Sequence, residues 1–319
     1  MESNNIVTVL AIMVFFATVS VSKQQVVAGD SVVVNYISTI STNNKNNNYG
    51  ISKEISKSAY SLEYMQTKAI ENLQEQEQSR LDTLEKKIRT FVKSDINKFG
   101  MVYYDINSKQ TIEINADKQF LAASTVKVPI NMLMYDMVQE KKIDINEKLV
   151  FEKVDFEDGA GILQGMDLTK PIAIKTLSDY SIKYSDNIAI NMLLRKVGSE
   201  SRYKYIEKIV GHPIIHDGNN ITPKDSFKIL ERLYLNPQNN KYYADMIKTM
   251  ENTECHDRID KYIPKEIVAH KMGNFNDTVN DTAIVYKDNP YILVVFTNGI
   301  VEANEVIGQV SKIIYDDQK

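Results

Sequence analysis

The sequence places β-prone segments near both ends of a long helical section, and this order limits the folds that the chain can adopt. The segments expected to form strands are Gly100 to Ile106, Gln110 to Asn115, Ile267 to Lys271, Thr282 to Lys287 and Tyr291 to Thr297. Turn-forming residues at Asn107-Ser108-Lys109 and Asp288-Asn289-Pro290 join neighbouring segments. Helices are expected from about Thr176 to Met250 and from about Ala303 to Tyr315. The pattern predicts an α/β (α+β) fold in which one antiparallel sheet, assembled from both chain ends and flanked by helices, carries an inserted all-helical lobe.

Ser124-Thr125-Val126-Lys127 forms an S-x-x-K motif directly before an apolar run that is expected to be helical. If the motif opens that helix, Ser124 and Lys127 stand at i and i+3 and share one face. A serine hydroxyl is a poor nucleophile until a base removes its proton, and a lysine is a base only when it is neutral. Burial and a second cation both lower a lysine pKa, and Lys271 is a candidate for that cation. An isolated S-x-x-K, by contrast, usually marks a helix cap beside a solvated lysine.

Two further motifs follow in the chain. Tyr184-Ser185-Asp186-Asn187 contains S-D-N, and His270-Lys271-Met272-Gly273 contains Lys-x-Gly. The S-D-N alone would be interpreted as a polar turn between two helices, with Asp186 or Asn187 capping the second. Acyl transfer needs a nucleophile, a base, a proton donor and an oxyanion site, and the three motifs together can supply them. Their combination, in this order and far apart in the chain, is therefore much more specific than any one of them.

Together the motifs resemble the S-x-x-K, S-D-N and K-T-G signature of class A β-lactamases and penicillin-binding proteins. The resemblance extends from about Glu85 to the C-terminus. It implies the fold predicted above, with the site in a cleft and Lys271 on an edge strand facing Ser124. Asp158 to Gly165 also resembles the glycine-rich loop that borders the active site in Gram-positive members. The third motif departs from the signature, because Met272 replaces a hydroxyl residue and cannot donate a hydrogen bond to a substrate carboxylate.

The resemblance implies three catalytic residues. Ser124 would be the acylated nucleophile, Lys127 would be its base, and Ser185 would relay a proton to the leaving nitrogen. These roles match the physical requirements of acyl transfer.

The resemblance also implies a set of substrate-binding residues, which are Asn187, Lys271, Gly273 and Asn274. Asn187 would steady Lys127 and the substrate amide. Lys271 would supply positive charge for a substrate carboxylate. The backbone N–H groups of Ser124 and Asn274 would form the oxyanion hole.

One expected residue is missing. Class A β-lactamases carry a glutamate between the second and third motifs, and it activates the water that removes the acyl group. The corresponding stretch, Gly211 to Asp225, contains no glutamate. Because a missing general base costs roughly 10²–10⁴-fold, slow or altered deacylation is expected. Asp217 and His216 are the candidates for a substitute base within this stretch.

These features imply an exported serine hydrolase of the class A β-lactamase type that forms an acyl-enzyme on Ser124 with β-lactams or peptidoglycan stem peptides. One alternative is a penicillin-binding protein resembling a D,D-carboxypeptidase or transpeptidase, which differs in deacylation. Another is a non-catalytic sensor that binds cell-wall peptide or antibiotic. The complete set of polar motif residues argues against the sensor, because a pure binding protein does not need it.

The N-terminal region is expected to have a different organisation. Ile6 to Val21 is a continuous, largely apolar stretch, so residues 1–22 are assigned as a signal peptide or an N-terminal membrane anchor. Residues 23–58 are expected to be a polar low-complexity linker, 59–84 a helical stalk and 85–319 the catalytic domain. This organisation predicts an extracytoplasmic protein, either secreted or anchored to the outer face of the cell membrane.

Composition narrows the functional classes further. The net charge is −4 and there is no basic block, so nucleic-acid binding is not expected. Cys255 is the single cysteine, which leaves no internal disulfide. The four histidines form no zincin-type motif, and Cys255-His256 has no partner at zinc-ligand spacing. We therefore expect no metal and no other cofactor, and the sequence leaves the oligomeric state open.

Overall fold

The computed structural model describes residues 49–318, and the chain divides into two compact units after Glu77. Helix α3 (Tyr49–Val92) crosses this division. Residues 49–58, expected to be linker, are therefore helical, because each residue added to an existing helix gains a hydrogen bond. The predicted signal or anchor segment and the rest of the linker lie outside the described residues. Among the described helices, none has the length and apolar character needed to cross a membrane.

The second unit, from Gln78 onward, contains a main sheet and a group of helices. After α3 its helices are α4 (Lys127–Gln139), α5 (Ile174–Lys183), α6 (Asn187–Val197), α7 (Ser199–Val210), α8 (Pro223–Leu235), α9 (Lys241–Met250) and α10 (Ala303–Asp317). Its strands are β1 (Phe99–Asp105), β2 (Thr111–Ile114), β3 (Phe120–Leu121), β4 (Lys148–Leu149), β5 (Ile172–Ala173), β6 (Asn220–Ile221), β7 (Val268–Phe275), β8 (Thr278–Val285) and β9 (Tyr291–Asn298). Short 3₁₀ turns include η2 (Ala123–Val126) and η4 (Leu163–Gly165).

The main sheet has five strands in the order β2-β1-β9-β8-β7, and all neighbouring pairs are antiparallel. Strand β1 pairs with β9, with Val102 opposite Val294, so strands from the two ends of the second unit meet in the middle of the sheet. Strand β7 forms one edge. This arrangement confirms the predicted antiparallel sheet assembled from both chain ends.

The hairpin of β7 and β8 is longer than the sequence predicted. Strand β7 continues past Lys271 to Phe275, and β8 begins at Thr278 instead of Thr282. The added residues include Gly273, Asn274, Asn280 and Asp281, which have low β-propensity. They extend the strands because each finds a cross-strand partner, such as Gly273 opposite Asn280, and pairing overrides intrinsic preference.

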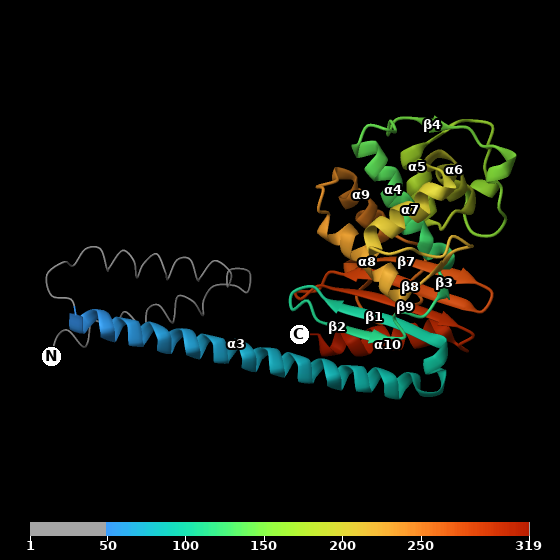
Figure 1. The fold of residues 1–319 in the computed structure, drawn as a ribbon. Coiled ribbons are helices and arrows are strands. Elements are labelled where there is room, and N and C mark those ends of the chain that lie inside the picture. The colour runs from blue at the N-terminus through green and yellow to red at the C-terminus, as the bar shows by residue number, and fades with distance from the viewer. Residues whose placement is uncertain (1–48, 319) are drawn as a thin grey trace. The chain divides into compact units, whose positions relative to one another are not determined.

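One face of the sheet is covered by α10 and by the part of α3 that follows Gln78 (Figure 1). The buried apolar residues of α3 recur at helical spacing, which places them on one stripe. The residues that join this core from the two helices are Leu81, Leu84, Ile88, Val92, Ile307, Val310 and Ile314.

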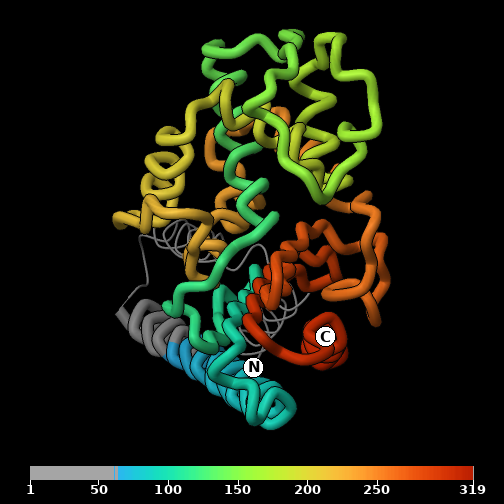
Figure 2. Tube along the Cα trace, turned by 90° about the vertical axis from the view of Figure 1, so that its right-hand side faces the viewer, coloured from blue at the N-terminus to red at the C-terminus, as the bar shows by residue number. Residues whose placement is uncertain are grey.

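The opposite face of the sheet is covered by α8, which contacts β1, β8 and β9. The other helices between residues 127 and 250 extend from it as a lobe, coloured green to orange in Figure 2. This confirms the predicted insertion of a helical section between the two groups of strands.

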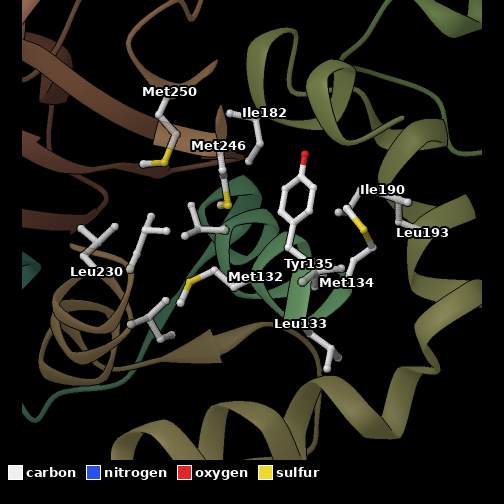
Figure 3. Packing of buried hydrophobic residues seen from close by; sticks show 14 of the residues in the cluster. Met132, Leu133, Met134, Tyr135, Ile182, Ile190, Leu193, Leu230, Met246 and Met250 are labelled. Atoms are coloured by element: carbon white, nitrogen blue, oxygen red, sulfur yellow. The ribbon is translucent and has the colours of Figure 1, made fainter. Parts of the chain in front are cut away.

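Helix α4 lies at the centre of this lobe (Figure 3). Its residues Met132, Met134 and Tyr135 are fully buried, and so is Asn131. A helix that is buried on every side belongs to a core. The Asn131 side chain donates to the carbonyl of Lys127 at 2.7 Å and to Ser181 Oγ at 2.9 Å, which ties the start of α4 to α5. The S-x-x-K motif therefore sits at the end of a firmly held helix.

The α3 residues after Gln78 should contribute to the stability of the second unit. We expect Leu84→Ala to lower the free energy of unfolding by about 2–5 kcal/mol, because Leu84 is fully buried and its removal leaves a cavity. Leu73→Ala, on the same helix, is the control, because Leu73 is 65% exposed and its loss should cost less than about 0.5 kcal/mol. Urea unfolding followed by circular dichroism measures both, and equal losses would contradict the assignment.

Candidate active site

Ser124 lies in the 3₁₀ turn η2, one turn before α4 begins at Lys127. The hydroxyl of Thr125 donates to the Ala122 carbonyl at 2.8 Å and stabilises this turn. Pro129 is accommodated because it falls in the first turn of α4, where backbone N–H groups have no intrahelical acceptor. Ser124 is only partly buried, and none of the described residues forms a hydrogen bond with its hydroxyl. Its oxygen is therefore available to a ligand.

Gly273 allows strand β7 to approach this turn. A Cβ atom at Gly273 would lie 2.6 Å from the Ala122 carbonyl oxygen and 3.2 Å from the Ser124 backbone nitrogen. Contacts below 3.0 Å do not occur for real side chains, so any other residue would push β7 away. The glycine of the third motif thus brings the edge strand against the turn that carries the first motif.

Ser185 links the first and third motifs. Lys271 Nζ donates to Ser185 Oγ at 2.9 Å, and Lys127 Nζ lies 3.3 Å from the same oxygen. Lys127 Nζ also donates to the Ser185 carbonyl at 2.5 Å and to Asn187 Oδ1 at 2.8 Å. Ser185 has φ of +54°, which non-glycine residues rarely adopt. This backbone conformation, held by its neighbours, presents both the carbonyl and the hydroxyl of Ser185 to the lysines.

Asp186 fixes the S-D-N turn from the other side. Its carboxylate accepts from the backbone N–H of Ala189 at 2.8 Å, so it caps α6 as the sequence suggested. The same carboxylate accepts from the N–H groups of Ile162 and Leu163 at 2.7 and 2.8 Å. Gly161, with φ of +122°, leaves room for this contact, because a Cβ there would lie 2.3 Å from the carboxylate.

The glycine-rich loop is therefore attached to the S-D-N turn. Asn187 Nδ2 donates to the Asp158 carbonyl at 3.2 Å, and the Asn187 N–H donates to the Ala160 carbonyl at 3.0 Å. The structure thus places the loop at Asn187, at the border of the site, as the resemblance implied.

The two lysines are almost completely buried, at 3% and 2% exposed. Burial lowers the pKa of Lys127 to about 8, while the nearby carboxylates of Glu157 and Asp186 partly oppose the shift. Burial and the charge of Lys127 lower the pKa of Lys271 well below its ordinary value. The lowered pKa makes the neutral amine of Lys127, which is the state that a base requires, accessible near neutral pH, where it is about one tenth of the population.

Arg258 also supports the site, although it belongs to none of the three motifs. Its guanidinium donates to the carbonyls of Gly273 and Asn280 at 3.0 and 2.7 Å, and to Asn274 Oδ1 at 2.5 Å. It is buried, in a loop that precedes β7. Arg258 therefore fixes the end of the edge strand, including Asn274, which is otherwise exposed.

Glu157 is a second residue that motif matching did not identify. Its carboxylate accepts from Asn191 Nδ2 at 2.9 Å, and its charge raises the pKa of Lys127. Asn191 follows Asn187 by one helical turn of α6, so both amides lie on one face of that helix. Asn191 thus holds the Glu157 carboxylate, whose charge acts on Lys127.

His216 and Asp217, the substitute bases expected from the sequence, make their contacts outside the three motifs. His216 stacks on Tyr203 with ring centroids 4.5 Å apart, and its Nε2 lies 2.9 Å from Glu207. The Asp217 carbonyl is contacted by Asn220 at 3.4 Å. The described structure shows no contact between either residue and Ser124, Lys127 or Ser185.

Comparison with known proteins agrees with the geometry. The model of the beta-lactamase enzyme family matches residues 83–318. Beta-lactamase 3 of Bacillus cereus is 26% identical over 252 residues, which cover 70% of this chain and 77% of that protein. Beta-lactamase BRO-1 of Moraxella catarrhalis is 24% identical over 247 residues, covering 68% of this chain and 79% of that protein.

Solved structures share the fold. A variant of PBP-A, as an acyl-enzyme complex with penicillin G, superposes with a TM-score of 0.68 at 23% identity, covering 74% of this chain and 96% of that one. An ancestral class A beta-lactamase gives a TM-score of 0.67 at 18% identity, covering 73% of this chain and 99% of that one. At these identities the likeness concerns the fold.

The lowered pKa of Lys127 can be measured directly. In a ¹³C NMR titration of the lysine ε-carbons, we expect the Lys127 resonance to titrate near pH 8, because burial disfavours the charged form. An ordinary lysine titrates at about 10.4. The neutral fraction of Lys127 should rise from about one tenth at pH 7 to about nine tenths at pH 9.

Two variants test the cause of this shift. Glu157→Gln should lower the pKa of Lys127 further, because it removes a charge that favours the ammonium form. Glu152→Gln, in the same loop region but paired with Arg195, should leave it unchanged. A Lys127 midpoint near that of ordinary lysines would contradict the described burial.

Proposed function

Because the chain belongs to the beta-lactamase enzyme family, we propose that it reacts with β-lactams to form an acyl-enzyme on Ser124. The chain is a serine hydrolase of the class A beta-lactamase type. The observation that carries the proposal is the contact of both buried lysines with the Ser185 hydroxyl, beside an unpartnered Ser124 hydroxyl. A penicillin acyl-enzyme of the structural neighbour PBP-A supports this choice of ligand class.

In the proposed acylation, neutral Lys127 takes the proton of Ser124 as the Ser124 oxygen attacks the β-lactam carbonyl carbon. When the carbon–nitrogen bond breaks, the Ser185 hydroxyl donates its proton to the leaving nitrogen. Ser185 then receives the proton held by Lys127, whose Nζ lies 3.3 Å from its oxygen. Lys127 returns to its neutral state, and protons balance without an external donor.

Substrate binding follows from the remaining groups. The N–H groups of Ser124 and Asn274 would hold the oxyanion, since Gly273 keeps β7 close to the Ser124 turn. Lys271, when protonated, would attract the substrate carboxylate, whose charge would favour the ammonium form. Asn187, already fixed to Asp158, would orient the substrate amide. Met272 supplies no hydroxyl, so this carboxylate loses one donor that the K-T-G signature would provide.

We also propose slow deacylation, so that the protein behaves more as a penicillin-binding protein than as an efficient β-lactamase. The loop from Gly211 to Asp225 supplies no glutamate, and neither His216 nor Asp217 contacts the motif residues. The Ile6–Val21 segment supports export, which would place the site where β-lactams and peptidoglycan peptides are found.

Labelling with a fluorescent penicillin tests the proposal. We expect the full chain to acquire one label, visible on a gel and as a mass increase of one adduct, that persists for many minutes because the loop from Gly211 to Asp225 supplies no glutamate to activate water. Ser124→Ala should abolish it, while Ser108→Ala, an exposed serine in the β1–β2 turn, should not.

The other outcomes distinguish the alternatives. Antibiotic consumption with only transient label would indicate an efficient β-lactamase and would contradict slow deacylation. A Ser124-independent label, or neither label nor hydrolysis, would contradict acylation by β-lactams and favour the non-catalytic sensor.

We propose Glu157 as the base for the residual deacylation, because its charge acts on Lys127 and Asn191 holds its carboxylate. We expect Glu157→Gln to slow the loss of label at least about tenfold, because removal of a general base typically costs 10²–10⁴-fold. Asp217→Asn is the matched control and should leave the rate unchanged. Pulse labelling followed by a chase with unlabelled penicillin measures both rates, and equal rates in the two variants would exclude a role for Glu157.

A further inference from the structure

Three potential metal ligands meet on the side of β7 that faces away from Lys271. His256 and Asp260 come from the loop between α9 and β7, and His270 comes from β7 itself. One ligand atom of each lies within 4.8 Å of the others. Asp260 Oδ2 contacts His256 Nδ1 and lies 3.5 Å from His270 Nε2. One carboxylate oxygen is therefore shared between two imidazole nitrogens.

The tautomer of His270 favours a metal ligand. Its Nδ1 lies 3.0 Å from Asp281 Oδ2, so the ring donates its Nδ1–H to that buried carboxylate. The other ring nitrogen, Nε2, lies 2.6 Å from the Thr253 hydroxyl and 3.5 Å from Asp260 Oδ2, so it is the nitrogen that would bind an ion. Histidines that bind metals almost always donate their other ring N–H to a carboxylate or carbonyl in this way.

Asp260 supplies a second, independent observation. Its side chain is 4% exposed, and its Oδ1 atom has no hydrogen-bond partner among the described residues. An unpaired carboxylate oxygen in a protein interior is costly unless a cation or another donor satisfies it. The buried Asp260 carboxylate therefore has one oxygen, Oδ1, that meets no donor in the described structure, while its Oδ2 faces the two imidazoles.

We propose that His256, Asp260 and His270 bind a divalent transition-metal ion of the Zn²⁺ class. Two imidazole nitrogens and one carboxylate oxygen are a donor set that Zn²⁺ accepts. To bind the ion, Asp260 Oδ2 and His256 Nδ1 would exchange their hydrogen bond for metal bonds and move apart, while His270 Nε2 already lies 3.5 Å from Asp260 Oδ2. The Thr253 hydroxyl would give up its contact with Nε2 to the ion. His256 is exposed, so the fourth position opens to solvent.

The site is separate from the acylation machinery. Successive residues of a strand point to opposite faces, so His270 and Lys271 lie on opposite sides of β7. The sequence alone does not reveal the site, because His256 and His270 form no zinc-binding motif. Folding of the loop onto β7 creates the cluster.

Titration of the untagged full chain with Co²⁺ and then Zn²⁺ tests this proposal. We expect one Co²⁺ per chain with visible d–d absorption typical of four-coordination, displaced by one equivalent of Zn²⁺. His256→Gln should weaken binding at least about tenfold, and its partly exposed position makes it compatible with folding. His212→Gln is the control, because His212 is also exposed and paired with a carboxylate, Asp225.

Further variants separate the proposed site from other sources of binding. Cys255→Ser should retain the ion, since the proposed ligands do not include the exposed thiol. Asp281→Asn should weaken binding about 10–100-fold, because it removes the carboxylate that orients His270. Binding that is absent in the wild-type chain, that survives His256→Gln, or that depends on Cys255 would overturn the proposal.

Discussion

Two buried lysine side chains converge on the hydroxyl of Ser185, and the candidate site depends on how the protein tolerates them. Two ammonium groups at this depth would be strongly unfavourable, because burial and mutual repulsion both penalise the charged form. The fold responds by lowering the pKa of Lys127 to about 8 and that of Lys271 well below its ordinary range. The lowered pKa that lets a lysine act as a base is therefore a direct result of its burial. The Ser185 carbonyl and hydroxyl and the Asn187 amide compensate by providing acceptors.

The surrounding structure holds the three motifs close enough for both lysines to contact the Ser185 hydroxyl. The buried helix α4 fixes Lys127, and the carboxylate of Asp186 fixes the S-D-N turn to both α6 and the glycine-rich loop. Gly273 permits close approach of the edge strand, and Arg258 ties the end of that strand. Each of these groups contacts a motif or positions the element that carries it. The relative positions of the three motifs are therefore set by the packed core and by the backbone. They do not depend on the lysine side chains, which are flexible by themselves.

Acylation and deacylation make different demands on this framework. The groups proposed for acylation belong to three motifs held by helices and strands, whereas water activation in class A enzymes depends on a glutamate in a loop. That loop differs here, and a carboxylate from another segment, Glu157, is held near Lys127 through Asn191. Because loops tolerate substitution more readily than cores, turnover can change while the acylating residues stay in place.

The sequence by itself determined the residue types and the order of the elements. The three motifs, the β1–β2 hairpin, the helix after Ser124 and the antiparallel sheet from both ends all follow from local patterns. It also established that Gly211 to Asp225 has no glutamate. These features can be predicted because a motif, a turn or a hydrophobic period depends on the types and spacing of a few neighbouring residues.

Tertiary structure alone decided which distant groups meet. Several contacts join segments that share no sequence pattern. Lys127 and Lys271 meet at one hydroxyl, and Arg258 supports Asn274. Glu157 acts on Lys127, and His256, Asp260 and His270 form a cluster. The extra length of β7 and β8 likewise arose from pairing that overrode weak β-propensity. Burial and proximity set pKa values and ligand geometry, and neither quantity exists until the chain has folded.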